Sequence, residues 1–345
     1  MTAPIRPVRL TDIDWEDRFF ALDGASDDAC RKVQASLDRL GMISPPVVWA
    51  GGASRFVIVD GFKRFEWLKA QRVEEAECRV HPEEVSRPEL LLSRIETRLC
   101  GPPVNGAEKA YIVRRLSEVV PDAVIVRTYL PVLSISGKPH ALDRWRRLAY
   151  SGHSLLGALA SGAIHERAAL DLADWGEPQA ESVVLSLLLE LRCSASIQVE
   201  ILERLHEIAV RDGCSRKEVL GRPAIASVMN HPDLHHRQKT QAIRNLLEGW
   251  RFPRLKAAEL EIRRELEEIP LPRSVSLSPP PGFEGNRWRL EIGFSEPEEL
   301  RKVLQEMESV ASSSRFHSLI KRKPGGKARR SAEMRLSPRK FPGDC

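Results

Sequence analysis

The sequence of 345 residues lacks any apolar run long enough to cross a membrane, and its six cysteines include no Cys-x-x-Cys pair. A membrane-spanning helix needs about 20 consecutive apolar residues, so we expect no contact with a membrane. Residues 1–7 also lack the pattern of a secretory signal peptide. Scattered cysteines without metal-ligand spacing favour reduced thiols in the cytoplasm and give little support to redox chemistry.

A net positive charge is lacking in most of the chain and is concentrated at its C-terminal end, because residues 1–314 have 43 Lys and Arg against 46 Asp and Glu. The whole sequence has 53 Lys and Arg against 48 Asp and Glu, but ten of the basic residues and only two of the acidic ones follow Ser314. The segment 313–345 also has few apolar residues and contains Pro324-Gly-Gly. It is therefore predicted to be a disordered basic tail that binds polyanions through phosphates, without reading a base sequence.

The most informative stretch is a predicted strand that runs through a glycine into a predicted helix. Residues 56–59 are apolar and mostly β-branched, Asp60-Gly61 interrupts them, and residues 62–71 have the apolar spacing of a helix. Backbone N–H groups at such a helix start, together with Lys63 and Arg64, could form a phosphate cradle. The alternative is an ordinary strand-turn-helix with solvated basic residues.

A second glycine-containing segment precedes this one. Ser26 is a good N-cap for a helix over residues 27–40, which Gly41 would end, with Cys30, Val33, Leu37 and Leu40 forming one apolar stripe. Gly41-Met-Ile-Ser-Pro45 then leads into an apolar strand ending at Trp49. The predicted order is helix, G-x-x-x-P segment, strand, strand, and G-x-K-R helix.

This order resembles the N-terminal domain of the ParB family, which shares its fold with sulfiredoxin. The resemblance covers residues 1–175, about half the chain, and implies that the G-x-x-x-P and G-x-K-R segments are nucleotide-binding boxes. It implies CTP with Mg²⁺ as the cofactor. The nucleotide-binding residues that it implies are Gly41, Ser44, Pro45, Gly61, Phe62, Lys63, Arg64 and Thr97.

The helix predicted over residues 88–99 lies where ParB proteins carry a third box. Glu96 matches that box and is the candidate catalytic residue, but Thr97 replaces an asparagine and Leu99-Cys100 replace a polar pair. Phe62 likewise replaces the usual glutamate of the second box. Hydrolysis needs polar groups that hold Mg²⁺ and position water, so the chain is expected to be at most a weak nucleotide triphosphatase.

A basic helical module is predicted over residues 105–176. Between Asn105 and Arg167 there are nine Lys and Arg against five acidic residues, which suits contact with a DNA backbone. Residues 124–135 are rich in β-branched side chains and contain Pro131, so no tight helix-turn-helix turn can be drawn, and a general packing module is the alternative. The candidate DNA-binding residues are Lys138, Arg144, Arg146 and Arg147.

The C-terminal half matches no family. Residues 177–269 are predicted to be helical, and the cluster His231-Pro-Asp-Leu-His-His236 is expected to be a polar loop rather than a metal site. Residues 270–312 are predicted to form a small β-β-α unit. Because so small a sheet cannot bury its face alone, this unit must dock on the helices or pair with a second copy, as a homodimer.

The expected fold class is α+β. The predicted parts are a ParB/sulfiredoxin-like domain at 1–100, a helix-turn-helix-like module at 105–176, an all-α domain at 177–269, a β-β-α unit at 270–312 and the tail at 313–345.

The first functional hypothesis is a DNA-binding, ParB-like protein of the cytoplasm, associated with the nucleoid, in plasmid or chromosome partition or a related DNA-associated process. One alternative is an enzyme of the same fold, a nuclease or phosphotransferase, and another is an adaptor whose nucleotide boxes have lost their function. An enzyme would need two or more carboxylates around a metal, and only Glu96 and Asp60 lie near the boxes.

Overall fold

The computed structural model describes residues 3–51, 55–280 and 287–321. The chain forms two compact units, residues 1–247 and 248–345, and each is described by itself. The helices predicted over residues 27–40, 62–71 and 88–99 and the strand predicted over residues 56–59 are present. Their bounds lie within a few residues of those expected from the sequence.

The first unit begins with a five-stranded mixed sheet of order β1-β5-β3-β4-β2. Antiparallel pairs join β1 to β5 and β3 to β4, whereas β3 pairs with β5 and β2 with β4 in parallel. The strands are β1 (Ile5–Arg9), β2 (Ile13–Asp14), β3 (Val47–Trp49), β4 (Phe56–Asp60) and β5 (Glu75–His81).

The core of this domain forms where the sheet meets α2 (Phe62–Ala70). Phe65 of α2 is fully buried among Val48, Ile58 and Cys78 of the strands. The same burial raises the pKa of the Cys78 thiol to about 11, so the thiol stays neutral and packs as an apolar group.

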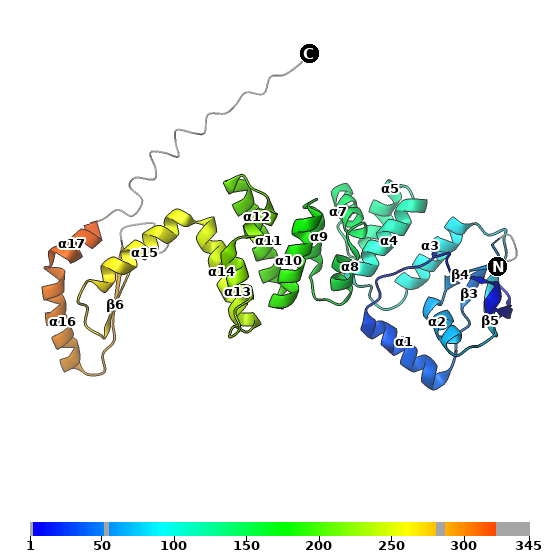
Figure 1. Cartoon of the computed structure of the whole chain (residues 1–345), viewed down its shortest axis with the longest axis horizontal. Helices are drawn as coiled ribbons and strands as arrows, with labels where there is room; N and C mark the ends of the chain where they lie inside the picture. Colours follow the sequence, from blue (N-terminus) through cyan, green and yellow to red (C-terminus); the bar gives the residue numbers. More distant parts are fainter. Residues whose placement is uncertain (1–2, 52–54, 281–286, 322–345) are drawn as a thin grey trace, which may run out of the picture. The chain divides into compact units, whose positions relative to one another are not determined.

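Two further helices flank the sheet: α1 (Asp27–Leu40) and α3 (Arg87–Leu99). Figure 1 shows α1 beside α2, and the indole Nε1 of Trp67 donates a 2.7 Å hydrogen bond to Asp38. Of the apolar stripe predicted on α1, only Leu37 is buried, whereas Val33 and Leu40 are 41% and 54% exposed. The helix thus packs through a narrower face than its sequence suggests.

Helices form the rest of the first unit. Residues 122–132, where no tight helix-turn-helix turn could be drawn from the sequence, are helical as α5 (Asp122–Val124), the π-helical turn η2 (Ile125–Tyr129) and α6 (Leu130–Val132). Pro131 lies just after the π-helical turn, and the chain stays helical across it as far as Val132.

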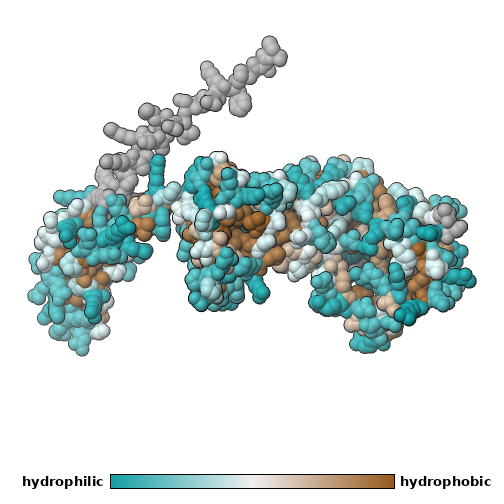
Figure 2. Space-filling model, in the orientation of Figure 1, coloured by the Kyte–Doolittle hydropathy of each residue, from teal (hydrophilic) through white to brown (hydrophobic). Residues whose placement is uncertain are grey.

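The predicted helices around this segment are also present. They are α4 (Gly106–Val119), α7 (Pro139–Ala149), α8 (His153–Ala160), α9 (Glu166–Ala173), α10 (Pro178–Leu191), α11 (Ala195–Asp212), α12 (Arg216–Leu220), α13 (Pro223–Met229) and α14 (His236–Arg251). Figure 2 shows apolar residues gathered on the visible face over α10 to α13.

The second unit contains α15 (Pro253–Glu267), an antiparallel pair of β6 (Val275–Ser278) and β7 (Arg289–Ile292), and α16 (Pro297–Ala311). It also contains α17 (Ser314–Lys321), where the sequence predicted the beginning of a disordered tail. Leu319 is 2% exposed and Phe316 packs beside it, so this segment has apolar contacts enough to be helical. The remainder of the predicted tail lies outside the described residues.

Candidate functional site

A cavity of about 470 Å³ lies between the start of α2, the chain leading into α1, and helices α3 and α4. The cavity is lined by five cations and five carboxylates. These are Arg18, Lys63, Arg64, Arg94 and Arg98, and Asp23, Asp27, Asp60, Glu66 and Glu108.

Gly61 makes the turn from β4 into α2 with the left-handed dihedral φ = 90°. A Cβ atom at this position would lie 2.8 Å from Nε of Arg64 and 2.9 Å from Cβ of Pro46. Glycine is therefore required both by the backbone conformation and by the close approach of these groups. The helix start that follows presents backbone N–H groups beside the cavity, an arrangement that favours anions.

Arg64 joins the two predicted boxes. Its guanidinium donates hydrogen bonds of 2.8 Å and 3.1 Å to the carbonyl oxygens of Ser44 and Pro45, and a third of 3.1 Å to Asp60. The structure therefore brings Ser44, Pro45, Gly61 and Arg64 together. It also gives Arg64 a role in holding the two segments in place.

Arg94 is the functional candidate that the sequence analysis missed. Its Nη2 lies 3.1 Å from Asp60, its side chain is only 16% exposed, and its Nε finds no partner among the described residues. Burial lowers the pKa of Arg94, while Asp60 opposes that shift. A signal existed, because Arg94 and Arg98 stand four residues apart on a predicted helix and so share one face.

Arg98 and Glu108 connect the cavity to the helical module. Nε and Nη2 of Arg98 donate hydrogen bonds of 2.9 Å and 2.7 Å to one oxygen of Glu108, which is 8% exposed. The other oxygen of Glu108 accepts from the backbone N–H of Asn105, which completes a capping box at the start of α4. The Glu108 carboxylate thus lines the cavity and also caps the start of α4.

The remaining cations of the cavity are paired at its rim. Lys63 lies 3.0 Å from Glu66, and that hydrogen bond raises the pKa of Lys63. Arg18 lies 2.7 Å from Asp23, and its guanidinium covers the ring of Phe62 at 5.2 Å. Every cation of the cavity therefore has a carboxylate partner in the protein itself.

Four of the predicted nucleotide-binding residues are absent from the described residues that line the cavity: Gly41, Ser44, Pro45 and Thr97. Gly41 ends α1 with φ = 67°, and its N–H donates to the carbonyl of Leu37. Thr97 donates a 2.8 Å hydrogen bond to the carbonyl of Ser93. Among the described residues, neither of the two lines the cavity.

The candidate catalytic residue Glu96 is exposed and is likewise absent from the described residues that line the cavity. It lies beside Tyr129, whose pKa is raised by burial and by its hydrogen bond with Glu96. On α3 it is Arg94 and Arg98, rather than Glu96, that face the cavity.

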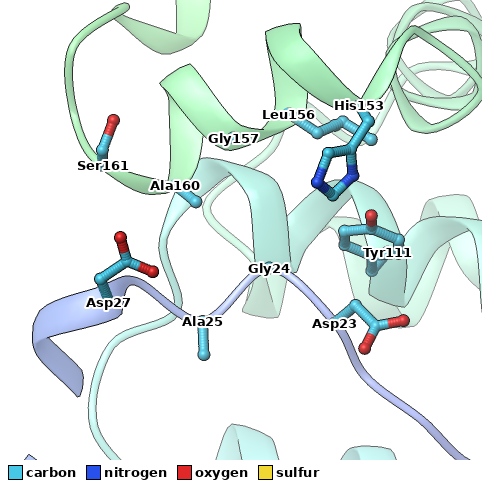
Figure 3. Close-up of a pocket in the computed structure, with 10 residues that line it drawn as sticks. All are labelled: Asp23, Gly24, Ala25, Asp27, Tyr111, His153, Leu156, Gly157, Ala160 and Ser161. Carbon is cyan, nitrogen blue, oxygen red and sulfur yellow. The ribbon is translucent and has the colours of Figure 1, made fainter. Parts of the chain in front are cut away.

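A second cavity, of about 600 Å³, lies on the other side of residues 23–27 (Figure 3). Its labelled side chains include Asp27, Tyr111, His153 and Ser161, and Gly24 lies at the centre of the view. Gly24 adopts φ = 99°, and a Cβ atom there would lie 2.8 Å from the backbone of Ala107 and of Glu108. The shared wall between the two cavities is therefore packed tightly on the start of α4.

The predicted DNA-binding arginines of α7 are held by carboxylates of neighbouring helices. Arg144 pairs with Asp171 at 2.6 Å and Asp174 at 2.5 Å, and Arg147 pairs with Asp174 at 2.7 Å. A hydrogen bond from Arg144 to each of these carboxylates opposes the effect of burial and raises the pKa of Arg144.

Arg146 is held in the same way. It donates hydrogen bonds to Asp122 and to the hydroxyl of Ser117, and the bond with Asp122 raises the pKa of Arg146. Only the fourth candidate, Lys138, and Arg127 of η2 are exposed cations beside the start of α7 without a carboxylate partner among the described residues.

Neither a metal site nor a membrane span is found in the part of the chain that the structure describes. No group of three or more His, Cys, Asp or Glu residues there could hold a metal ion. The predicted histidine cluster contains His235 and His236, whose rings lie 5.9 Å apart. No described helix is long and apolar enough to cross a membrane.

Comparison with known proteins gives structural matches only. No family model matches the chain, and neither does any curated protein. The C-terminally truncated chromosome-partitioning protein ParB from Caulobacter crescentus, complexed with CTP-γ-S, is 16% identical with a TM-score of 0.23, over 54% of this chain and 99% of that chain.

The same ParB protein complexed to the centromeric parS site is 14% identical with a TM-score of 0.27, over 64% of this chain and 100% of that chain. A Pnob8-like ParB-N domain is 13% identical with a TM-score of 0.38, over 72% of this chain and 98% of that chain. All three TM-scores are low, so a function for this chain must rest on its own residues. The solved structures that this chain matches include ParB and ParB-N domains.

Proposed function

We propose that this chain is a DNA-binding, ParB-like protein whose N-terminal domain binds a nucleoside triphosphate in the cavity beside α2. The observation that supports this most is the convergence of Arg64, Arg94 and the backbone N–H of Gly61 on one point, at the start of a helix. Two guanidinium groups and a helix N-terminus are the donors that phosphate groups prefer.

Cytidine triphosphate with Mg²⁺ is the proposed ligand, because it is what the G-x-x-x-P and G-x-K-R boxes imply by resemblance. The described residues offer no metal site of their own. Mg²⁺ commonly keeps several waters and binds through substrate phosphates, so it would enter the cavity together with the nucleotide.

Turnover of the nucleotide is proposed to be weak or absent. General-base or water-positioning chemistry needs a carboxylate or amide near the phosphates. Glu96 is exposed and outside the cavity lining, and Asp60 is engaged by two arginines. Binding without efficient hydrolysis fits this arrangement better than a phosphotransferase or nuclease does.

The proposed DNA-binding module is the helical segment 122–132, the turn that follows it, and α7. Lys138 is the N-cap residue of α7, and Arg127 lies on the preceding helical segment. Both are exposed, so they are available to a groove of DNA, whereas Arg144, Arg146 and Arg147 would first have to leave Asp171, Asp174 and Asp122. Lys138 and Arg127 are therefore the residues proposed to make the first contact.

We also propose domains at 1–100, 105–176, 177–269 and 270–312, and a homodimer through the β-β-α unit. A role in partition or a related DNA-associated process, and a place in the cytoplasm near the nucleoid, complete the proposal.

The experiment that tests the nucleotide proposal is a calorimetric titration of the purified chain with CTP and Mg²⁺, with and without DNA. The proposal expects saturable binding that is largely lost in Arg94→Ala and kept in Arg39→Ala. Arg39 is a matched control because it is an exposed arginine of the last turn of α1, outside the cavity lining. Equal binding by both variants would contradict the proposed site.

An adaptor whose boxes no longer bind nucleotide is the second candidate. It is favoured by one observation, that every cation of the cavity already has an internal carboxylate partner. A wild-type chain that binds neither CTP nor inorganic tripolyphosphate would make this the better interpretation.

A further inference from the structure

The carboxylate of Asp60 lies where three donors of the cavity meet. Its Oδ1 accepts a 2.7 Å hydrogen bond from the N–H of Gly61 and lies 3.1 Å from Nη2 of Arg94. Its Oδ2 accepts a 3.1 Å hydrogen bond from Nη2 of Arg64. The Asp60 carboxylate thus interacts with a backbone N–H at a helix start and with the guanidinium groups of two arginines.

This set of donors is what an oxygen of a phosphate group would require. Anions at helix starts are bound by backbone N–H groups, and arginines add charge-assisted hydrogen bonds. Within the proposed function, on which this inference rests, Asp60 therefore occupies a position that a ligand phosphate would otherwise fill. Its side chain is 26% exposed, so solvent and ligands can reach it.

We infer that Asp60 is an internal anion that competes with the phosphate chain of the ligand for Arg64 and Arg94. A polyphosphate carries several negative charges and can displace a single carboxylate. Arg64 would keep its place during this exchange because the carbonyl groups of Ser44 and Pro45 still hold it. Arg94 would gain most from contact with the phosphate, since it is the more deeply buried of the two arginines. Its Nε also has no hydrogen-bond partner among the described residues.

The opposite role is a positioning one, in which Asp60 orients the two arginines for the ligand. The two roles predict opposite effects of removing the charge. As a competitor, Asp60 weakens anion binding, so Asp60→Asn binds more tightly. As a positioning residue, Asp60 strengthens binding, so the same variant binds more weakly.

The test is calorimetric titration of the full chain with inorganic tripolyphosphate, for the wild type, Asp60→Asn and Asp27→Asn. Asp27 lines the same cavity but has no ion pair among the described residues, so its variant measures the general effect of removing one negative charge. We expect Asp60→Asn to bind at least about tenfold more tightly, since hydrogen bonds to charged groups contribute about that much or more. Asp27→Asn should change the affinity far less.

Unchanged or weaker binding by Asp60→Asn, with the melting temperature retained, would overturn the inference and leave the proposed function standing. An equal gain in Asp27→Asn would overturn it too, because the effect would then be general. If Asp60→Asn does not fold, Asp60→Ser keeps an acceptor for the N–H of Gly61 and is measured in its place. Absence of binding by the wild type and by every Asp60 variant would remove both the inference and the proposed phosphate site.

Discussion

The guanidinium of Arg64 donates a 2.8 Å hydrogen bond to the carbonyl oxygen of Ser44, twenty residues earlier in the chain. The same side chain reaches Pro45 and Asp60, so it ties the segment before β3 to the start of α2. Arg64, a residue of the proposed phosphate site, is therefore also a structural link between these two segments.

We therefore predict two effects for Arg64→Ala. Nucleotide binding should be largely lost, because the variant removes one of the two arginines at the proposed phosphate position. The free energy of unfolding should also fall by about 1 to 3 kcal/mol, because the variant removes several partly buried hydrogen bonds to a charged group. Calorimetric titration and thermal unfolding measure the two effects separately.

Arg39→Ala serves as the control for both measurements. An Arg64→Ala variant that keeps the wild-type affinity for CTP would refute the phosphate role, whatever its stability. A variant with unchanged stability would instead refute the structural link described here.

The position of Glu96 leads to a prediction about turnover. Glu96 is exposed beside Tyr129 and does not belong to the described residues of the cavity lining, so Glu96→Gln should leave any slow release of phosphate from CTP unchanged. A phosphate-release assay with Mg²⁺ checks this. Rapid hydrolysis in the wild type that disappears in Glu96→Gln would show that Glu96 does reach the nucleotide.

Residues 23–25 and Asp27 line both cavities, and a methyl group added at Gly24 should lower the stability of the protein. Gly24→Ala places a Cβ 2.8 Å from the backbone of Ala107 at φ = 99°, so we expect a loss of about 1 to 3 kcal/mol in unfolding free energy. Gly157→Ala is the matched control. A Cβ at Gly157, within α8, would meet no atom within 4 Å, so this variant should gain up to about 1 kcal/mol.

Chemical unfolding of the two variants measures this difference directly. Equal stability of Gly24→Ala and the wild type would mean that residues 23–27 can move away from α4 at little cost.

The exposed cations Lys138 and Arg127 should contribute more to DNA recognition than the arginines of α7 that are paired with carboxylates. The double variant Lys138→Glu with Arg127→Glu should lose most of any sequence preference, measured by selection from random DNA, while remaining folded. Arg144→Ala should instead lower the unfolding free energy by about 1 to 3 kcal/mol, because Asp171 and Asp174 lose their shared partner. Loss of preference in Arg144→Ala without any loss of stability would reverse this assignment.

Truncation after Lys321 should act differently from these substitutions. Residues 322–345 contain eight Lys and Arg against two acidic residues, so their removal should lower affinity for every DNA sequence and reduce the dependence on salt. Any sequence preference should survive. If the truncated chain binds no DNA, and selection with the full chain yields no motif, the adaptor would be the better interpretation.

Much of the N-terminal fold was predictable because its signals are local. The N-cap at Ser26, the glycine at the end of α1 and the β-branched run of β4 each act within a few residues, and the structure contains all of these elements. The helical segment 122–132 was not predicted, because its β-branched residues and Pro131 disfavour a helix locally. Packing of Ile125 and Leu130, both fully buried, outweighs that preference.

By itself, the sequence determined the order of the elements and the glycine turn at Gly61, since these follow from backbone conformation and apolar spacing. Only the tertiary structure decided which cations face the cavity and which are already paired. Arg94 of α3 meets Asp60 of β4, and Arg144 meets Asp171 and Asp174, which lie 27 and 30 residues later in the chain. Ion pairs join residues through space, so neither composition nor spacing along the chain can identify the partners.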